Sequence, residues 1–404
     1  MQPHSVTRSF LQTAIVLGLL MAIGPFAIDM YLPALPTIGR TLNATPGAVQ
    51  ASLMAFFVAL GVGQVFYGPL SDMLGRKIPL YFGVGLFGVG SVGCALASDI
   101  ETLVALRFVQ GLGACVGMVV PRAVVRDLHT GAEATRLMAM LLLVFSVSPI
   151  LAPLAGSLLI DVAGWRSVFW AVTAIALLLL ALLATALPET RPPAQRVTST
   201  LRSAMAAYAL LLRDRHFLGL VFIGAFGSSS FFAYLANSPF VMIDHFGLTP
   251  RQYSLVFALN AAAYIGAAQY AAALSLRFGQ LALVRIATTG FAFTMLLLLA
   301  LHLLGVDRLD VMVILLLLGF GCYGLASPAL SVLALDPHGP IAGTASALMG
   351  TLQFVTGAVV MAVIGFFVDG SARPMLLGIA GCASLALVLT LRTLGLRTLP
   401  HQPS

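Results

Sequence analysis

The chain has 404 residues, of which 60% are hydrophobic and only 9% are charged. A soluble domain carries about a quarter charged residues, so this composition excludes an ordinary soluble enzyme and predicts an integral membrane protein. The formal net charge is +7, but the basic residues are spread thinly between apolar segments and form no patch, which argues against nucleic acid as a partner. Twelve spans of about 20 residues need roughly 240 residues, which matches the apolar content.

Apolar stretches bounded by charges, Pro or Gly predict an all-α protein with twelve transmembrane helices and both termini in the cytoplasm. The expected spans are 10–34, 47–69, 79–97, 102–124, 134–158, 165–187, 217–240, 252–273, 281–304, 310–332, 341–367 and 374–394. The first is expected to be a retained span and not a cleaved signal. With this topology fifteen Lys and Arg residues lie inside and five outside, as the positive-inside rule requires.

The predicted organisation is an N-terminal six-helix half over 1–187, a cytoplasmic linker with an interfacial helix over 188–215, and a C-terminal six-helix half over 216–404. Thr45-Pro46 and Thr249-Pro250 each predict a helix N-cap followed by Pro in the first turn. The same offset of 204 residues carries Gly75 onto Gly279. Two matches at one offset indicate a duplication of the six-helix unit.

Motifs for covalent chemistry are not evident. Two GxGxxG stretches, from Gly83 and from Gly319, lie inside apolar spans, where close helix packing explains them better than a dinucleotide site. The four cysteines lie in apolar runs without metal-ligand spacing, so we expect them to pack in the core and expect no metal site. The sequence therefore predicts a protein that is not an enzyme and holds no cofactor; a receptor is not excluded by composition.

The turn after the second span is the most distinctive segment. It reads Gly-Pro-Leu-Ser-Asp-Met-Leu-Gly-Arg-Lys over 68–77, with Gly68 and Gly75 bounding the turn and Asp72 close to Arg76. Topology alone explains the two cations but not the spacing of the glycines and the acid. The segment resembles the loop motif of the major facilitator superfamily, and that resemblance implies that Asp72, with Arg76 and Arg126, locks the cytoplasmic side.

Further motifs narrow the resemblance. Residues 103–114, which include Arg107, are similar to a superfamily motif of proton-coupled members, and residues 149–156 are similar to the antiporter motif with Ala152 in place of Gly. Residues 29–36, 164–169 and 187–191 also match, so the chain resembles the bicyclomycin-resistance (Bcr/CflA) group of drug:proton antiporters. The antiporter motif implies a kinked helix, with Pro153 and Gly156 contributing to gating.

The resemblance implies a monomeric, multi-pass protein of the bacterial inner membrane that exports small amphipathic drugs, similar to bicyclomycin or chloramphenicol, in exchange for protons. Its partners would be the drug and the lipid bilayer, and protons would be the coupling ion. The alternative is a proton-coupled importer of a small polar metabolite or osmolyte. The residues alone do not set the direction of transport.

Two charged residues inside the predicted spans carry the coupling hypothesis on their own chemistry. Asp29 lies about five residues from the outer end of the first span, and Arg107 about five residues from the outer start of the fourth. At 1.5 Å per residue both would lie roughly 8 Å below the outer boundary and could share one cavity. The alternatives are a first helix that ends before Pro33 and leaves Asp29 in water, and an Arg107 that extends to the headgroups.

The candidates for substrate binding are residues inside the apolar spans whose side chains end in a hydroxyl or an amide group: Tyr31, Tyr234, Asn237, Asn260 and Tyr264. Tyr234 and Asn237 lie three residues apart on one helix face, next to Ser238-Pro239, where the helix is expected to break. For each residue alone, a hydrogen bond to a neighbouring helix is an equally good explanation.

Overall fold

The computed structural model describes residues 3–129, 131–192 and 201–395. Every regular element in these ranges is helical. The elements are α1 (Pro3–Asp29), η1 (Leu32–Ala34), α2 (Leu35–Thr41), α3 (Pro46–Leu74), α4 (Lys77–Leu96), α5 (Ile100–Leu128), α6 (Gly131–Ala163), α7 (Arg166–Thr185), α8 (Leu201–Leu211), α9 (Arg215–Pro239), η3 (Phe240–His245), α10 (Pro250–Phe278), α11 (Gln280–Leu303), α12 (Leu309–Leu335), η4 (Asp336–Ile341), α13 (Ala342–Gly365) and α14 (Arg373–Leu394).

Twelve of the described helical segments are long and apolar enough to cross a membrane, which confirms the predicted number of spans. Several extend beyond the predicted ends, because polar residues at a membrane surface continue the helix. The second span, for example, continues through Asp72 to Leu74. An even number of crossings puts the start of α1 and the end of α14 on one side of the bundle. We call this the linker side, because α8 lies there, and the other the opposite side.

The predicted helix caps are present in both halves. The side chain of Thr45 accepts a hydrogen bond from the backbone N–H of Ala48, and Thr249 forms a capping box with Gln252. Gly75 and Gly279 end the same two helices with φ of 89° and 83°, a region that glycine adopts without strain. The two copies of the cap and the turn therefore have one backbone conformation.

The helix break expected at Ser238-Pro239 is a change of winding. The α-helix α9 ends at Pro239, and the chain continues as the π-helix η3 to His245.

The linker helix α8 packs on α13, with Leu211 fully buried against the core around Phe217. Met205 of the same helix is 63% exposed, so an apolar side chain remains available to the membrane surface, as the predicted interfacial helix requires.

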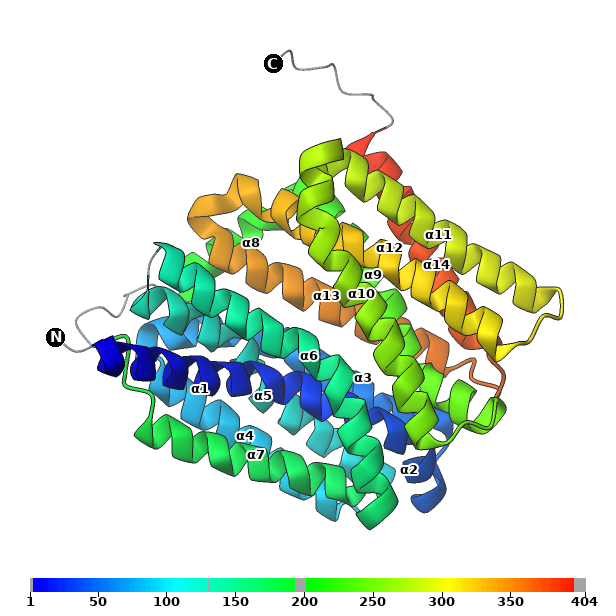
Figure 1. Cartoon of the computed structure of the whole chain (residues 1–404), viewed down its shortest axis with the longest axis horizontal. Coiled ribbons are helices and arrows are strands. Elements are labelled where there is room, and N and C mark those ends of the chain that lie inside the picture. The colour runs from blue at the N-terminus through cyan, green and yellow to red at the C-terminus, as the bar shows by residue number, and fades with distance from the viewer. Residues whose placement is uncertain (1–2, 130, 193–200, 396–404) are drawn as a thin grey trace.

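The two groups of helices, α1–α7 and α9–α14, lie side by side and meet along α3 with α13 and α6 with α10 (Figure 1). Glycines form much of the α3–α13 contact. A Cβ on Gly47 would lie 3.0 Å from the carbonyl oxygen of Gly365, and one on Gly61 would lie 3.2 Å from the Cβ of Phe354. Thr351 donates a hydrogen bond to the carbonyl of Gly61 at 2.9 Å. The two backbones therefore approach closely along this contact.

Polar contacts close the opposite side between the two halves. Arg40 of α2 pairs with Asp244 of η3 at 3.0 Å. The buried amide of Gln50 donates to Asn237 at 3.0 Å. The structure thus represents a conformation in which the opposite side is closed.

Orientation in the membrane stays a prediction and has a direct test. Arg308 is exposed on the opposite side, and Glu133 is exposed at the start of α6 on the linker side. We expect a cysteine at position 308 to react with an impermeant maleimide on intact cells, and one at position 133 to react only after permeabilisation. The native chain measures the background of its own four cysteines, and the reverse labelling pattern would overturn the predicted topology.

Candidate functional site

Asp29 is the last residue of α1 and the one acid among the described residues that is buried, with 5% of its surface exposed. After it the chain turns through Met30 and Tyr31 into η1, where Pro33 lacks the N–H that a continuing helix needs. The helix therefore ends before Pro33, as the alternative interpretation of Asp29 supposed, in which this residue would be left in water. The carboxyl is nevertheless enclosed by protein, within electrostatic range of the Tyr253 phenol on α10 of the other half.

Arg107 of α5 is fully buried. Its Nη1 donates to the carbonyl of Ala27 at 3.1 Å and to Oε1 of Gln110 at 2.6 Å. The guanidinium carbon lies 4.5 Å from the ring centroid of Tyr31 and 4.3 Å from that of Phe56. The side chain is thus held inside the N-terminal half by cation–π contacts and does not extend to the headgroups.

Asp29 and Arg107 lie at one level of the bundle, because Arg107 bonds to the carbonyl two residues before Asp29. They do not form an ion pair: neither residue has one within the described part of the chain, and the groups that act electrostatically on Arg107 are Tyr31 and Cys94. Arg107 of α5 therefore lies beside the end of α1 that carries Asp29, but the two charged groups do not pair.

The five candidate binding residues fall in three places. In the C-terminal half, Tyr234 accepts a hydrogen bond from Nδ2 of Asn260 at 3.3 Å, while Tyr264 stacks on Tyr323 with centroids 5.8 Å apart. Oδ1 of Asn260 is buried and has no partner among the described residues. Tyr31 lies in the other half beside Arg107, and its hydroxyl is 2.7 Å from Oγ of Ser52. Of the five candidates, Tyr234, Asn260 and Tyr264 therefore lie close together, since the rings of Tyr234 and Tyr264 both contact that of Phe231.

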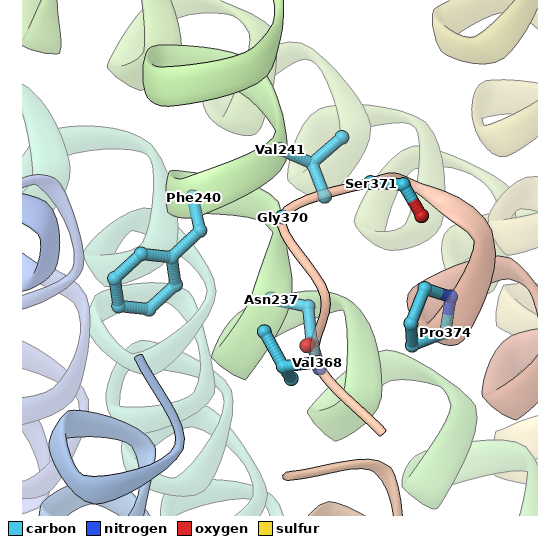
Figure 2. A pocket seen from close by; sticks show the side chains of 7 residues that line it. All are labelled: Asn237, Phe240, Val241, Val368, Gly370, Ser371 and Pro374. Atoms are coloured by element: carbon cyan, nitrogen blue, oxygen red, sulfur yellow. The ribbon is translucent and has the colours of Figure 1, made fainter. Parts of the chain in front are cut away.

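Asn237 belongs to the contact between the halves, although it lies on the same helix face as Tyr234. Its Oδ1 accepts from Gln50, and its Nδ2 donates to the carbonyl of Ala233 at 2.9 Å. Figure 2 shows a pocket beside it, between η3 and the loop before α14. The pocket is lined by Asn237, Phe240, Val241, Val368, Gly370, Ser371 and Pro374. It lies at the opposite-side end of the C-terminal half, and neither Asp29 nor Arg107 lines it.

On the linker side Arg76 is almost fully buried at the centre of a polar network. Its Nη1 donates to Asp72 at 2.8 Å, and its Nε donates to Asp127 at 2.7 Å. Burial alone would lower the pKa of Arg76, but the hydrogen bonds and charges of Asp127 and Asp72 outweigh it and raise the pKa. The guanidinium therefore stays charged and ties the turn after α3 to the end of α5.

The start of the linker joins this network. Glu189 accepts hydrogen bonds from the backbone N–H groups of Arg76 and Lys77 at 2.9 and 3.1 Å, which places an anion at the N-terminus of α4. Arg191 donates to Asp72 at 2.8 Å, so this carboxylate is shared by two arginines. Glu189 and Arg191 lie in the segment 187–191, which contributes to the family resemblance, but the sequence predicted no role for them.

The resemblance implied that Arg126 acts with Asp72 and Arg76, but in the described conformation the residue of α5 that joins them is Asp127. Arg126 is exposed and makes no ion pair with a described residue, whereas the next residue, Asp127, faces Arg76. Successive residues of a helix point about 100° apart, so one position decides which side chain faces the turn. Gly75 has the positive φ already described, while a Cβ on Gly68 would meet no atom within 4 Å.

Pro153 and Gly156 both lie where α6 touches another helix. The carbonyl of Pro153 accepts a hydrogen bond from Oγ of Ser254 on α10 at 2.9 Å, which joins the halves. A Cβ on Gly156 would lie 2.8 Å from Cα of Met30, next to Asp29.

Some glycines of the two GxGxxG stretches lie at helix contacts, as the sequence predicted. Gly83 faces Val116 and Gly324 faces the backbone of Tyr264, but Gly85 faces open space.

Comparison with known proteins identifies the family. The sequence model of the Major Facilitator Superfamily matches residues 17–361. The chain belongs to the Major Facilitator Superfamily. It is 36% identical to the uncharacterized MFS-type transporter YdgK of Bacillus subtilis (strain 168), over 92% of this chain and 93% of the relative.

A bicyclomycin resistance protein homolog of Haemophilus influenzae (strain Rd) is 27% identical, over 93% of this chain and 94% of the relative. The fold matches the crystal structure of a D-xylose-proton symporter with a TM-score of 0.73 and 17% identity, over 93% of this chain and 96% of that one. The resemblance inferred from the motifs is confirmed. As a member of this family the chain is a transporter and not an enzyme, and it is a multi-pass protein of the bacterial inner membrane.

Proposed function

We propose that this transporter exports small amphipathic drugs in exchange for protons. The observation that carries the proposal is Asp29, a buried acid at the end of α1 where the N-terminal half meets α10. Buried ionisable groups in membrane spans are costly and are retained mainly for function. Similarity to the bicyclomycin resistance protein homolog supports drugs as the substrates.

Alternating access moves Asp29 between two environments. In the described conformation the opposite side is closed by Arg40 with Asp244 and by Gln50 with Asn237, and Asp29 is held in protein. Rocking that separates the halves at this side brings water to the end of α1. A carboxyl holds its proton better in an apolar setting and releases it more readily near water or a cation. The proton is therefore loaded and unloaded as the halves move.

The test of the proposed function is flux in proteoliposomes that contain only this protein. With the linker side facing inward, an inward proton gradient should drive drug out of the vesicles against its own gradient. Collapse of the pH gradient with an ionophore should reduce flux to the level of empty vesicles. Accumulation of substrate inside the vesicles under the same gradient would show an importer instead.

The shared carboxylate of Asp72 gives a prediction for the linker-side network. Asp72→Asn removes the charge that Arg76 and Arg191 hold in common, and Arg191→Gln removes one of its two partners. We expect turnover to fall roughly ten-fold in Asp72→Asn, which corresponds to about 1.4 kcal/mol in a barrier. Arg191→Gln should have a smaller effect in the same direction.

Substrate affinity is the control for this gating role. The network lies on the linker side, away from Asp29, so drug binding in detergent should stay within about two-fold of the native protein. Glu133→Gln alters an exposed acid on the same side and should change neither quantity. A loss of affinity in Asp72→Asn equal to its loss of turnover would contradict a role in gating.

A further inference from the structure

Two nitrogen atoms of the Arg107 guanidinium donate a hydrogen bond to nothing in the described chain. All of its protein hydrogen bonds are made by Nη1, while Nε and Nη2 are buried without a partner. Nε–H and one Nη2–H point in parallel along one edge of the planar group. This edge is the one that holds a carboxylate through two parallel hydrogen bonds.

The charge of Arg107 is also uncompensated. Arginine stays protonated in proteins, and no carboxylate of the described residues lies within 4.0 Å of it. A buried cation without a counter-ion is strongly disfavoured, and the bonds to Ala27 and Gln110 supply only neutral acceptors. Both the sign of the charge and the geometry of the free edge therefore select a planar anion.

The neighbouring helices hold this edge in a fixed direction. Gln110, which binds Nη1, donates through Nε2 to Ser91 at 2.7 Å, and Ser91 donates to the carbonyl of Phe87 at 2.7 Å. A Cβ on Gly90 would lie 2.7 Å from the backbone nitrogen of Gln110, so α4 and α5 are in direct contact here. The binding group is thus preorganised before any ligand arrives.

The surroundings of the edge are aromatic. Tyr31 and Phe56 lie against the guanidinium, and the ring centroid of Phe169 is 5.9 Å from its central carbon. Tyr31 immediately precedes η1, the segment that packs on α9 and α10 of the other half. Separation of the halves on the opposite side therefore moves one of the covering rings and opens a route to the free edge.

We propose that the Nε–Nη2 edge of Arg107 binds the carboxylate of aromatic acids, so that the substrates of this transporter include amphipathic organic anions. This inference rests on the proposed export function and specifies its substrate class. The carboxylate would take the two free N–H donors, and its ring would replace contacts with Tyr31 and Phe169. A lipophilic cation would meet the uncompensated charge and bind less well.

The test compares three probes of one shape on the purified full-length protein: 1-naphthoate, its neutral amide 1-naphthamide, and the cationic 1-naphthylmethylamine. Calorimetric titration should show naphthoate binding at least ten-fold more tightly than either analogue. In Arg107→Gln, which removes the charge, this preference should disappear, and in Arg107→Lys, which keeps the charge but not the two parallel donors, it should become smaller. Arg122→Gln changes an exposed arginine of the same helix and should keep the preference.

The comparison of probes in the native protein decides the inference even if the Arg107 variants do not fold. Equal binding of naphthoate and naphthamide would overturn it, as would naphthoate binding that emerges only in Asp29→Asn, which would assign the edge to Asp29. Proton-driven flux of a neutral drug is measured in parallel. Flux without a preference for the anion overturns the inference alone, whereas absence of flux for every probe overturns the proposed function.

Discussion

Asp29→Asn is expected to abolish uphill drug transport driven by a proton gradient. The amide keeps the size of the side chain and part of its hydrogen bonding but has no proton to exchange, and Asp29 is the acid that the described structure buries between the halves. Downhill exchange of a neutral drug should persist. The direct measurement is proton release on addition of drug to the purified protein, which should vanish in the variant.

A matched acid keeps this prediction specific. Asp161 lies near the opposite-side end of α6 but is exposed, so Asp161→Asn removes an equal charge without touching the proposed coupling group. Release and uphill transport should be normal in that variant. Drug-induced proton release that survives in Asp29→Asn would show that the coupling carboxylate lies elsewhere.

Gly156→Ala is expected to have the second large effect. The added methyl group would press on the backbone of Met30, and backbone next to the end of a helix cannot move aside as a flexible side chain can. Overpacking of this kind costs about 1–3 kcal/mol. We expect a lower melting temperature in detergent and a large loss of transport, because α6 would displace the segment that positions Asp29.

Gly85→Ala is the control, since a Cβ there meets no atom within 4 Å. It should melt at the native temperature or slightly above, as alanine favours helix more than glycine does. If Gly156→Ala retained full stability and proton-coupled transport, the close approach of α6 to α1 would have no role in positioning the acid.

The number and type of the elements were predictable from the sequence, because an apolar run of about 20 residues in lipid must satisfy its backbone hydrogen bonds within one helix. The N-caps at Thr45 and Thr249 were also predictable, because a threonine side chain accepts a hydrogen bond from the first turn and the following proline needs no partner there. The ends of the spans were less accurate. A stretch such as Ser71 to Leu74 continues α3 although its composition resembles a loop.

The site was predictable where it depends on single residues and not where it depends on the rotation of helices. Burial of Asp29 followed from its place inside an apolar run. The choice of Asp127 over Arg126 depends on how α5 is turned about its axis, which no local pattern specifies. The spread of the five polar candidates over three places has another cause, the helices that pack at each level of the bundle, since Tyr234 and Asn237 share a helix face but reach different neighbours.

The glycine-lined contact between α3 and α13 has a mechanical consequence. At Gly47 and Gly365 the two helices meet through backbone, and at Gly61 the side chains of Phe354 and Val355 pack against the glycine of α3. Nearby, the rings of Phe57, Phe232 and Phe354 stack with centroids 4.5 to 5.6 Å apart, and flat rings shear past one another at little cost. We therefore expect the stacked rings to stay in contact while the two halves rotate, although the contacts at the opposite-side end, such as Gln50 with Asn237, separate.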